Sequence, residues 1–173
     1  MVIIPITSPD GLGLIRTIAD RVWPQTYAPI LTSEQITYMM EMMYADTVLR
    51  REFAAGVRFD VLSADGDLAG FLSYGDGGGD EAAKLHKLYL APEYHHRGIG
   101  SRMLRHAIAV NARAGYRRLL LNVNKQNANA LLAYRRNGFI EKAKVKVDIG
   151  GGFFMDDFVM ERLLTPDDAK SAE

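Results

Sequence analysis

Apolar residues return with helical spacing twice within residues 9–43, and this spacing predicts two helices. The first should begin after Ser8, a residue type that caps helices, and should be broken at Pro24, which lacks a backbone N–H. The second should be capped by Thr32 or Ser33. The predicted apolar faces are Leu14, Ile15, Ile18, Ala19 and Val22, and then Ile36, Met39, Met40 and Met43.

Short runs rich in branched and aromatic residues predict strands between and after these helices. Asp65 and Gly66 stand between two such runs and are typical of a hairpin turn. The glycines at 77–79 predict a flexible loop. The predicted strands are residues 2–7, 57–63, 68–74, 82–90, 116–124, 139–147 and 153–162.

Two further helices complete the predicted order of elements. One should follow Gly100 and end at Gly115, and a shorter one should run from Asn127 to Arg136. The order predicts an α/β (α+β) fold, with a single mixed, mostly antiparallel central sheet of about seven strands flanked by helices on both faces. We expect one domain over residues 1–173, in which residues 164–173 form a polar, frayed C-terminal tail.

Composition narrows the functional classes. The 173 residues are 48% hydrophobic and 24% charged, as in ordinary globular proteins, and no apolar run is long enough for a membrane helix or a signal peptide. A cytoplasmic location is therefore expected. Cysteine is absent, which excludes disulfides, a thiolate metal site and a cysteine nucleophile, and we expect no metal.

The net charge is zero, but the charges are unevenly distributed. Residues 94–140 contain no Asp or Glu and nine basic residues, a segment that would favour a polyanion or would simply be a solvated basic face. No aromatic residues alternate with these arginines, as they do in proteins that stack on nucleic acid bases, so nucleic acid is not an expected partner. The basic residues are Arg97, Arg102, Arg105, Arg113, Arg117, Arg118, Lys125, Arg135 and Arg136.

The stretch "LAPEYHHRGIGSRM" joins a predicted strand to a predicted helix through Gly98 and Gly100. Glycines at a strand-to-helix turn leave backbone N–H groups open toward an anion. The third glycine of a dinucleotide fingerprint is absent, because Met103 stands there, and the Lys-Ser/Thr pair of a P-loop is absent too. The turn therefore indicates an anion site of another kind.

The wider context resembles the GNAT family of N-acetyltransferases. "KLYLAPEYHHRGIGSRML" is similar to that family's acetyl-CoA loop, Gln/Arg-x-x-Gly-x-Gly/Ala after the fourth strand, and "NANALLAYRRNGF" is similar to its second signature. The element order also agrees. The resemblance implies acetyl-CoA as cofactor and transfer of its acetyl group to an amine. One departure is that His95 stands at the family's Gln/Arg and His96 at a frequently small residue.

The resemblance also implies roles for individual residues. The pantetheine arm of coenzyme A should bond to the fourth strand, its pyrophosphate to the glycine turn, and nearby arginines could meet its 3′-phosphate. Tyr134 matches the tyrosine that protonates the leaving thiolate. His86 is the candidate base, with Glu81 as an alternative. The implied cofactor residues are Leu88, Tyr89, Leu90, His95, His96, Arg97, Gly98, Ile99, Gly100, Ser101, Asn127 and Ala130.

The acceptor is expected to be a primary amine of a small molecule. The first two helices form the acceptor wall in this family, which makes Tyr27 a candidate contact, while Trp23 is expected to pack. Asp156 and Asp157 should point to opposite faces of a strand, and one of them could attract a cationic amine. A weaker resemblance to bacterial polyamine acetyltransferases of the PaiA type suggests a polyamine.

Two other functions compete with this interpretation. The chain could acetylate an amine of a protein or peptide, or it could be a non-catalytic regulator that binds coenzyme A. The expected partners are the amine substrate and a second copy of the chain in a homodimer, with neither nucleic acid nor a membrane among them.

Overall fold

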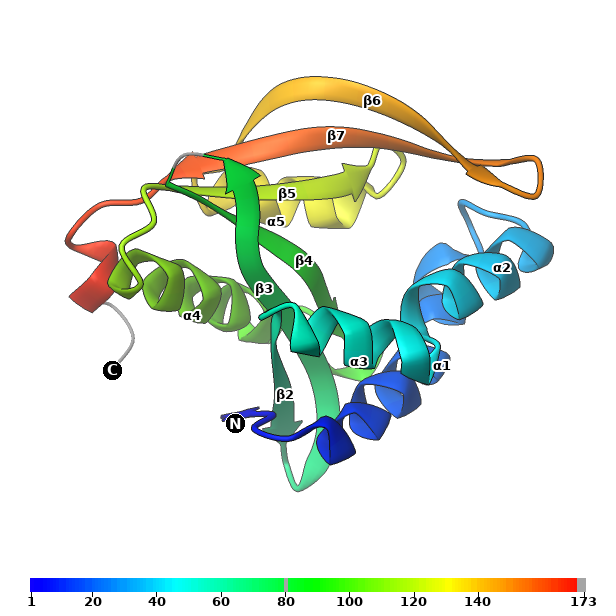
Figure 1. Cartoon of the computed structure of the whole chain (residues 1–173), viewed down its shortest axis with the longest axis horizontal. Coiled ribbons are helices and arrows are strands. Elements are labelled where there is room, and N and C mark those ends of the chain that lie inside the picture. The colour runs from blue at the N-terminus through cyan, green and yellow to red at the C-terminus, as the bar shows by residue number, and fades with distance from the viewer. Residues whose placement is uncertain (80, 171–173) are drawn as a thin grey trace. The chain divides into compact units, whose positions relative to one another are not determined.

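In the computed structural model, which describes residues 1–79 and 81–170, seven strands form one mixed sheet flanked by helices (Figure 1). The strand order is β1-β2-β3-β4-β5-β7-β6. β4 and β5 are parallel, while β1/β2, β5/β7 and β6/β7 are antiparallel, so the predicted fold class is confirmed. The strands are β1 (Val2–Pro5), β2 (Arg58–Ala64), β3 (Asp67–Gly79), β4 (Ala82–Leu90), β5 (Arg118–Asn124), β6 (Ile140–Gly150) and β7 (Phe153–Leu163).

The helices interrupt the strands at three places in the sequence. They are α1 (Gly13–Tyr27), α2 (Ser33–Tyr44), α3 (Asp46–Ala54), α4 (Ile99–Arg113) and α5 (Ala128–Arg136), with short 3-10 turns at Pro9–Leu12, Pro92–Tyr94 and Asp168–Lys170. The contacts between residues group the chain into two compact units. The first unit contains Met1–Ser73 and Lys87–Gly100, and the second contains Tyr74–His86 and the chain from Ser101 onward.

The first helix differs from its prediction at both ends. Ser8 caps a 3-10 turn, not an α-helix, and accepts from the N–H of Asp10. α1 then runs through Pro24 to Tyr27. Pro24 lies in the last turn, so it removes a single donor, and its own carbonyl accepts from Ala28 at 3.0 Å. The predicted break at Pro24 is therefore wrong.

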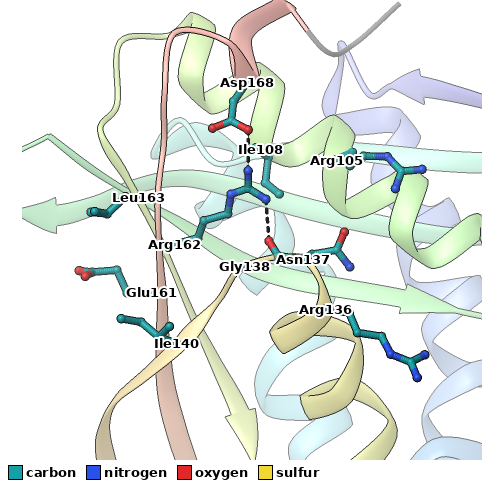
Figure 2. Close-up of a pocket in the computed structure, with 10 residues that line it drawn as sticks. All are labelled: Arg105, Ile108, Arg136, Asn137, Gly138, Ile140, Glu161, Arg162, Leu163 and Asp168. Carbon is teal, nitrogen blue, oxygen red and sulfur yellow. Dashed lines mark hydrogen bonds and ion pairs between the residues drawn. The ribbon is translucent and has the colours of Figure 1, made fainter.

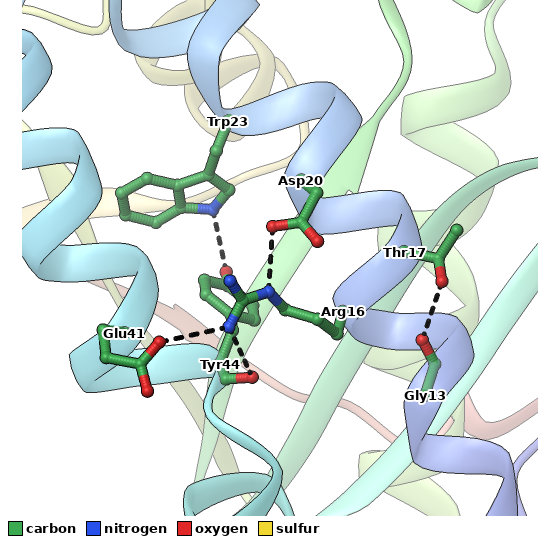
Figure 3. Close-up of polar contacts among 7 residues, drawn as sticks. All are labelled: Gly13, Arg16, Thr17, Asp20, Trp23, Glu41 and Tyr44. Carbon is green, nitrogen blue, oxygen red and sulfur yellow. Dashed lines mark hydrogen bonds and ion pairs between the residues drawn. The ribbon is translucent and has the colours of Figure 1, made fainter.

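Packing explains why α1 continues to Tyr27. Trp23 is almost fully buried and its Nε1–H donates to the hydroxyl of Tyr44 at 2.9 Å (Figure 3). The guanidinium of Arg16 lies among Asp20, Glu41 and the backbone carbonyl of Tyr44, which ties α1 to the end of α2. The hydrogen bond of Trp23 holds the C-terminal part of α1 in place, and the contacts of Arg16 hold its N-terminal part.

Other helical predictions were confirmed in part. Thr32 caps α2 as predicted, and the predicted faces of α1 and α2 are buried except at Leu14, which is 41% exposed, and at Met43, which is half-buried. The apolar repeat of α4 also predicts a buried face, and all five of its residues are buried: Ile99, Met103, Leu104, Ala107 and Ile108. α3 was not predicted; it is nine residues long and Leu49 is its only buried residue, so its apolar pattern is short.

The glycines at 77–79 belong to β3 and not to a loop. A Cβ atom on Gly77 would lie 2.8 Å from the carbonyl oxygen of Ala82, so glycine lets the two chain segments approach each other closely. The predicted loop is therefore wrong, because all three glycines belong to β3 and Gly77 allows a close approach of the backbone.

The predicted frayed tail is also wrong for residues 164–170. The N–H of Leu164 donates to the carbonyl of Arg117 at 2.8 Å, and Arg162 forms an ion pair with Asp168 at 2.6 Å. Asp168 also accepts from the N–H of Thr165. Residues 171–173 of the predicted tail lie outside the described residues.

We expect Gly70→Ala to destabilise the protein. A Cβ at this position of β3 would lie 2.4 Å from the carbonyl oxygen of Tyr89, within the first unit, so β3 and β4 must separate locally. Overpacking of this kind costs about 1–3 kcal/mol of unfolding free energy. Urea unfolding measures the loss, and Gly13→Ala serves as control, because no atom lies within 4 Å of its new Cβ. An unchanged midpoint for Gly70→Ala would contradict the close approach.

Candidate active site

The predicted site residues divide between the two units. Tyr27, the end of β4 and the glycine turn belong to the first unit. His86, Ser101, α5 and the two adjacent aspartates of β7 belong to the second. Each unit is described in turn below.

The glycine turn of the first unit follows β4 and the 3-10 turn Pro92–Tyr94 and leads into α4, as predicted. Gly98 has φ +73°, a backbone conformation that favours glycine. No atom lies within 4 Å of a Cβ built on Gly98, and only Leu90, at 3.9 Å, lies near one built on Gly100. The turn is therefore open on the side where these side chains would project, and the first N–H groups of α4 suit an anion.

His95 lies at the start of this turn and bonds to the end of β4. Its Nε2 lies 2.9 Å from the carbonyl oxygen of Leu90, which can only accept, so Nε2 carries the proton. A neutral imidazole has a single N–H, and in His95 that N–H is already used. His95 can donate to a phosphate through Nδ1 only when the ring is charged.

The two residues after His95 are His96, which has an unusual backbone conformation, and Arg97, which is bound to the β2–β3 turn. His96 has φ +60°, an unfavourable value for a residue with a Cβ. Arg97 donates to the carboxylate of Asp65 at 2.9 Å and lies 5.3 Å from the ring centroid of Tyr94. The charge of Arg97 is therefore partly compensated before any anion binds.

Leu88 and Tyr89 are half-buried on β4, and the Tyr89 ring joins an aromatic cluster of the first unit. The hydroxyls of Tyr27 and Tyr89 lie 3.1 Å apart, and the rings of Trp23 and Tyr27 lie 4.5 Å apart. Burial raises the pKa of the Tyr44 phenol well above its usual value, which keeps that hydroxyl neutral. Trp23 packs in this cluster, as expected from the sequence, whereas the side-chain contacts of Tyr89 and Tyr44 were not foreseen.

In the second unit, α5 carries three of the predicted residues on one face. Asn127 caps the helix by accepting from the N–H of Ala130 at 3.2 Å, and Tyr134 follows two turns later. The Tyr134 ring is half-buried, with its centroid 5.7 Å from that of Phe139. Asn137, after the helix, donates to the hydroxyl of Ser101 at 3.5 Å. The spacing that resembles the family signature therefore does place its members on a common helix face.

The pairing of β4 with β5 is short. It joins Ala82–Leu85 to Arg118–Leu121, and His86 is the next residue of β4, half-buried. β5 goes on pairing with β7 as far as Asn124, which is opposite Asp157. The pairing of β4 with β5 therefore ends one residue before the predicted base.

Asp156 and Asp157 lie on opposite faces of β7, as predicted. Asp156 forms an ion pair with Lys125. Asp157 is 5% exposed, and burial raises the pKa of its carboxyl, with a further contribution from Asp156. Asn122, Lys125 and Lys84 act in the opposite direction by favouring its charged form.

A cavity of about 730 Å³ lies in the second unit among α4, α5 and the ends of β6 and β7 (Figure 2). Arg105 and Arg136 flank it, and Arg162 donates in it to the carbonyl of Asn137 and to Asp168. Sequence analysis singled out the basic segment but did not foresee this cavity. Its arginines suit an anionic group.

Two further features concern the described residues: membrane-spanning helices and metal-binding clusters. Residues 1–79 and 81–170 contain no helix that is both long and apolar enough to cross a membrane. In the same residues no three His, Asp or Glu side chains gather in a way that could hold a metal ion.

Comparison with known proteins identifies the class. Residues 17–139 match the Acetyltransferase (GNAT) family. The chain therefore belongs to the GNAT family of acetyltransferases. It is an acyl-CoA-dependent N-acetyltransferase, and acetyl-CoA is its cofactor, as the sequence resemblance implied.

Individual relatives cover between about half and nearly all of the chain. The spermidine N(1)-acetyltransferase of Thermoplasma acidophilum is 29% identical over 152 residues, which are 85% of this chain and 91% of the relative. The streptothricin acetyltransferase of Streptomyces lavendulae is 37% identical over 81 residues, 47% and 43% of the two chains. The crystal structure of the PaiA N-acetyltransferase from Thermoplasma acidophilum in complex with coenzyme A is 28% identical, with a TM-score of 0.75 over 94% of this chain and 99% of that one.

We expect His96→Gly to stabilise the protein by up to about 1 kcal/mol, because glycine adopts φ +60° without a Cβ penalty. Thermal melting measures the change. His95→Gly is the control, since His95 has φ −65° and its bond to Leu90 would be lost, so its melting temperature should fall. Equal losses in both variants would show that His96 is not strained.

Proposed function

We propose that this acetyltransferase acts on a primary amine of a small molecule, and that its acceptor is a polyamine. The observation that carries this proposal is the similarity, over 85% of the chain, to a protein named spermidine N(1)-acetyltransferase. The family match begins in α1 and ends after α5, so it spans both compact units. We therefore also propose that residues 1–173 act as one acetyltransferase domain.

The residues present fit the proposed cofactor. The glycine turn leaves the space that a Cβ at Gly98 would fill open, and backbone N–H groups at the start of α4 can receive the pyrophosphate. Leu88, Tyr89 and Leu90 are proposed to bond the pantetheine arm through their backbone, as in strand addition, and Asn127 and Ala130 to contact it from α5. Arg105 and Arg136 are proposed to meet the 3′-phosphate. When bound, acetyl-CoA supplies the activated acetyl group.

Two proton transfers fall to the side chains of this chain. Tyr134 is proposed to give its phenolic proton to the departing thiolate. The acceptor, an ammonium ion in water, must lose a proton before its nitrogen can attack. His86 is the base proposed from the sequence, and it follows directly after the last paired residue of β4.

The acceptor site is proposed to include Tyr27, whose half-buried ring lies beside Trp23 and can face a cation. Asp156 and Asp157 were both candidates for the ammonium. The ion pair with Lys125 already compensates the charge of Asp156, which favours Asp157.

The proposal also covers the location of the enzyme, its oligomeric state and its partners. We propose a cytoplasmic protein that forms a homodimer and has neither nucleic acid nor a membrane as partner. Acetylation of a protein or peptide amine is the alternative substrate class, and a non-catalytic coenzyme A-binding regulator is the alternative function.

An acceptor panel tests the function. Thiol release from acetyl-CoA is measured with spermidine, spermine, putrescine, simple monoamines and lysine-containing peptides. We expect the highest kcat/KM for the polyamines, since a buried carboxylate and aromatic rings suit a cationic amine. Thiol release with peptides alone would favour the alternative substrate, and binding of acetyl-CoA without thiol release for any amine would favour the regulator.

Tyr134→Phe should lower kcat by about 10²-fold and leave the affinity for acetyl-CoA nearly unchanged, because the ring stays while the proton donor is removed. Steady-state kinetics and calorimetry with acetyl-CoA measure the two quantities. Tyr116→Phe is the matched control, since Tyr116 lies outside the predicted site. A kcat for Tyr134→Phe within twofold of the parent would remove Tyr134 from the acid role.

A further inference from the structure

The sheet of the second unit has a polar face at the point where β4 and β5 part. Lys84 is opposite Leu120 in the parallel pair, and Asn124 is opposite Asp157 in the antiparallel pair. Opposite residues share a face, and so do residues two apart on one strand. Lys84 and His86 of β4, Asn122 of β5 and Asp157 of β7 therefore lie on the same face.

The acidic side chains of β7 differ in whether a nearby cation compensates their negative charge. Asp156, on the other face, is paired with Lys125. Glu161, on the same face as Asp157, lies 3.3 Å from Lys142 and 3.6 Å from Arg118. In the described part of the chain, no cation lies within ion-pair distance of Asp157. Of these three carboxyls on β7, Asp157 is therefore the one without an ion-pair partner in the described residues.

The groups on the face of Asp157 come from the adjacent strands β5 and β6 and from β4, which lies beyond β5 in the sheet. β4 presents Lys84 and His86, β5 presents Asn122, and β6 presents the apolar Val145 opposite Asp157. Lys125 follows β5, and Asp156 precedes Asp157 on β7. Among the groups that influence the carboxyl, Asn122 bonds its charged form, while Asp156 opposes it.

We propose that Asp157, and not His86, is the general base that takes the proton from the acceptor ammonium; this rests on the proposed function. The carboxylate accepts one proton from R–NH3⁺, which leaves R–NH2 with the lone pair that forms the new N–C bond as the C–S bond breaks. The nitrogen then loses a second proton, the thiolate gains one, and Asp157 returns its proton to water. The net reaction releases one proton.

Chemistry supports this assignment beyond position. An ordinary aspartate, with a pKa near 3.9, is too weak a base to remove a proton efficiently from an ammonium ion. Burial moves the pKa of Asp157 upward, toward the range in which a base is both ionised and effective at neutral pH. Asn122 and the lysines act against that rise, because they favour the charged form of the carboxyl.

The test is the pH dependence of kcat. The rate is measured as thiol release, with an amine of the panel that the unmutated enzyme acetylates. The acid limb reports protonation of the base. Asp156→Asn removes a like charge, lowers the pKa of Asp157 and should move the acid limb to lower pH. Asn122→Ala removes a hydrogen bond to the carboxylate, raises that pKa and should move the limb to higher pH. These opposite shifts are the expected result.

Two further variants separate the candidate bases. Asp157→Asn should lower kcat by about 10²–10⁴-fold and abolish the acid limb of the pH profile. In His86→Gln the acid limb should remain at the same pH as in the unmutated enzyme. A folded Asp157→Asn enzyme that retains the limb overturns the proposal, and so does loss of the limb in His86→Gln. Should Asp157→Asn fail to fold, the opposite shifts in Asp156→Asn and Asn122→Ala decide, and their absence overturns the assignment.

Failure of the polyamine proposal looks different. If the parent acetylates another amine and no polyamine, the substrate proposal fails, while the same profiles, measured with that amine, still test Asp157. A parent that acetylates no amine overturns both proposals.

Discussion

The parallel pairing of β4 with β5 ends at Leu85 and Leu121, and the arrangement of the site depends on this end. β5 goes on pairing with β7 as far as Asn124, beyond the point where its pairing with β4 ends. A strand edge presents regularly spaced N–H and C=O groups that an extended arm can bond. The end of β4, from Leu88 to Leu90, supplies the backbone groups that we propose for pantetheine, and β7 supplies the carboxyl of Asp157.

The glycine turn that we propose for the pyrophosphate is held in a conformation with some cost in stability. His95 holds the turn to the end of β4 through the carbonyl of Leu90, and Arg97 holds it to the β2–β3 turn through Asp65. His96 is kept at φ +60°, which a residue with a Cβ adopts only where its surroundings impose it. The histidine that replaces the family's Gln/Arg therefore acts here first on the loop, because its neutral ring has no second N–H to offer.

Local signals in the sequence predicted most of the fold. The bounds of β4, the cap at Thr32 and the apolar face of α4 depend on neighbouring residues alone, and the structure has them as predicted. Predictions failed where distant residues decide. Pro24 stays helical because Trp23 is anchored by a residue of α2, and Gly77 is part of a strand because another strand approaches its backbone. α3 was missed because its nine residues give only a short apolar pattern.

The adjacent acids of β7 show how far the sequence can lead toward the site. Alternation along a strand requires that Asp156 and Asp157 point to opposite faces, but it does not say which one is buried. The register of β7 against β5 decides this, because it sets Asp157 opposite Asn124 and on the face of Asn122, while Lys125, just after β5, pairs with Asp156. A buried carboxyl without a cation lowers stability. A stronger base follows from the same burial, so the position that is costly for the fold is the one suited to proton transfer.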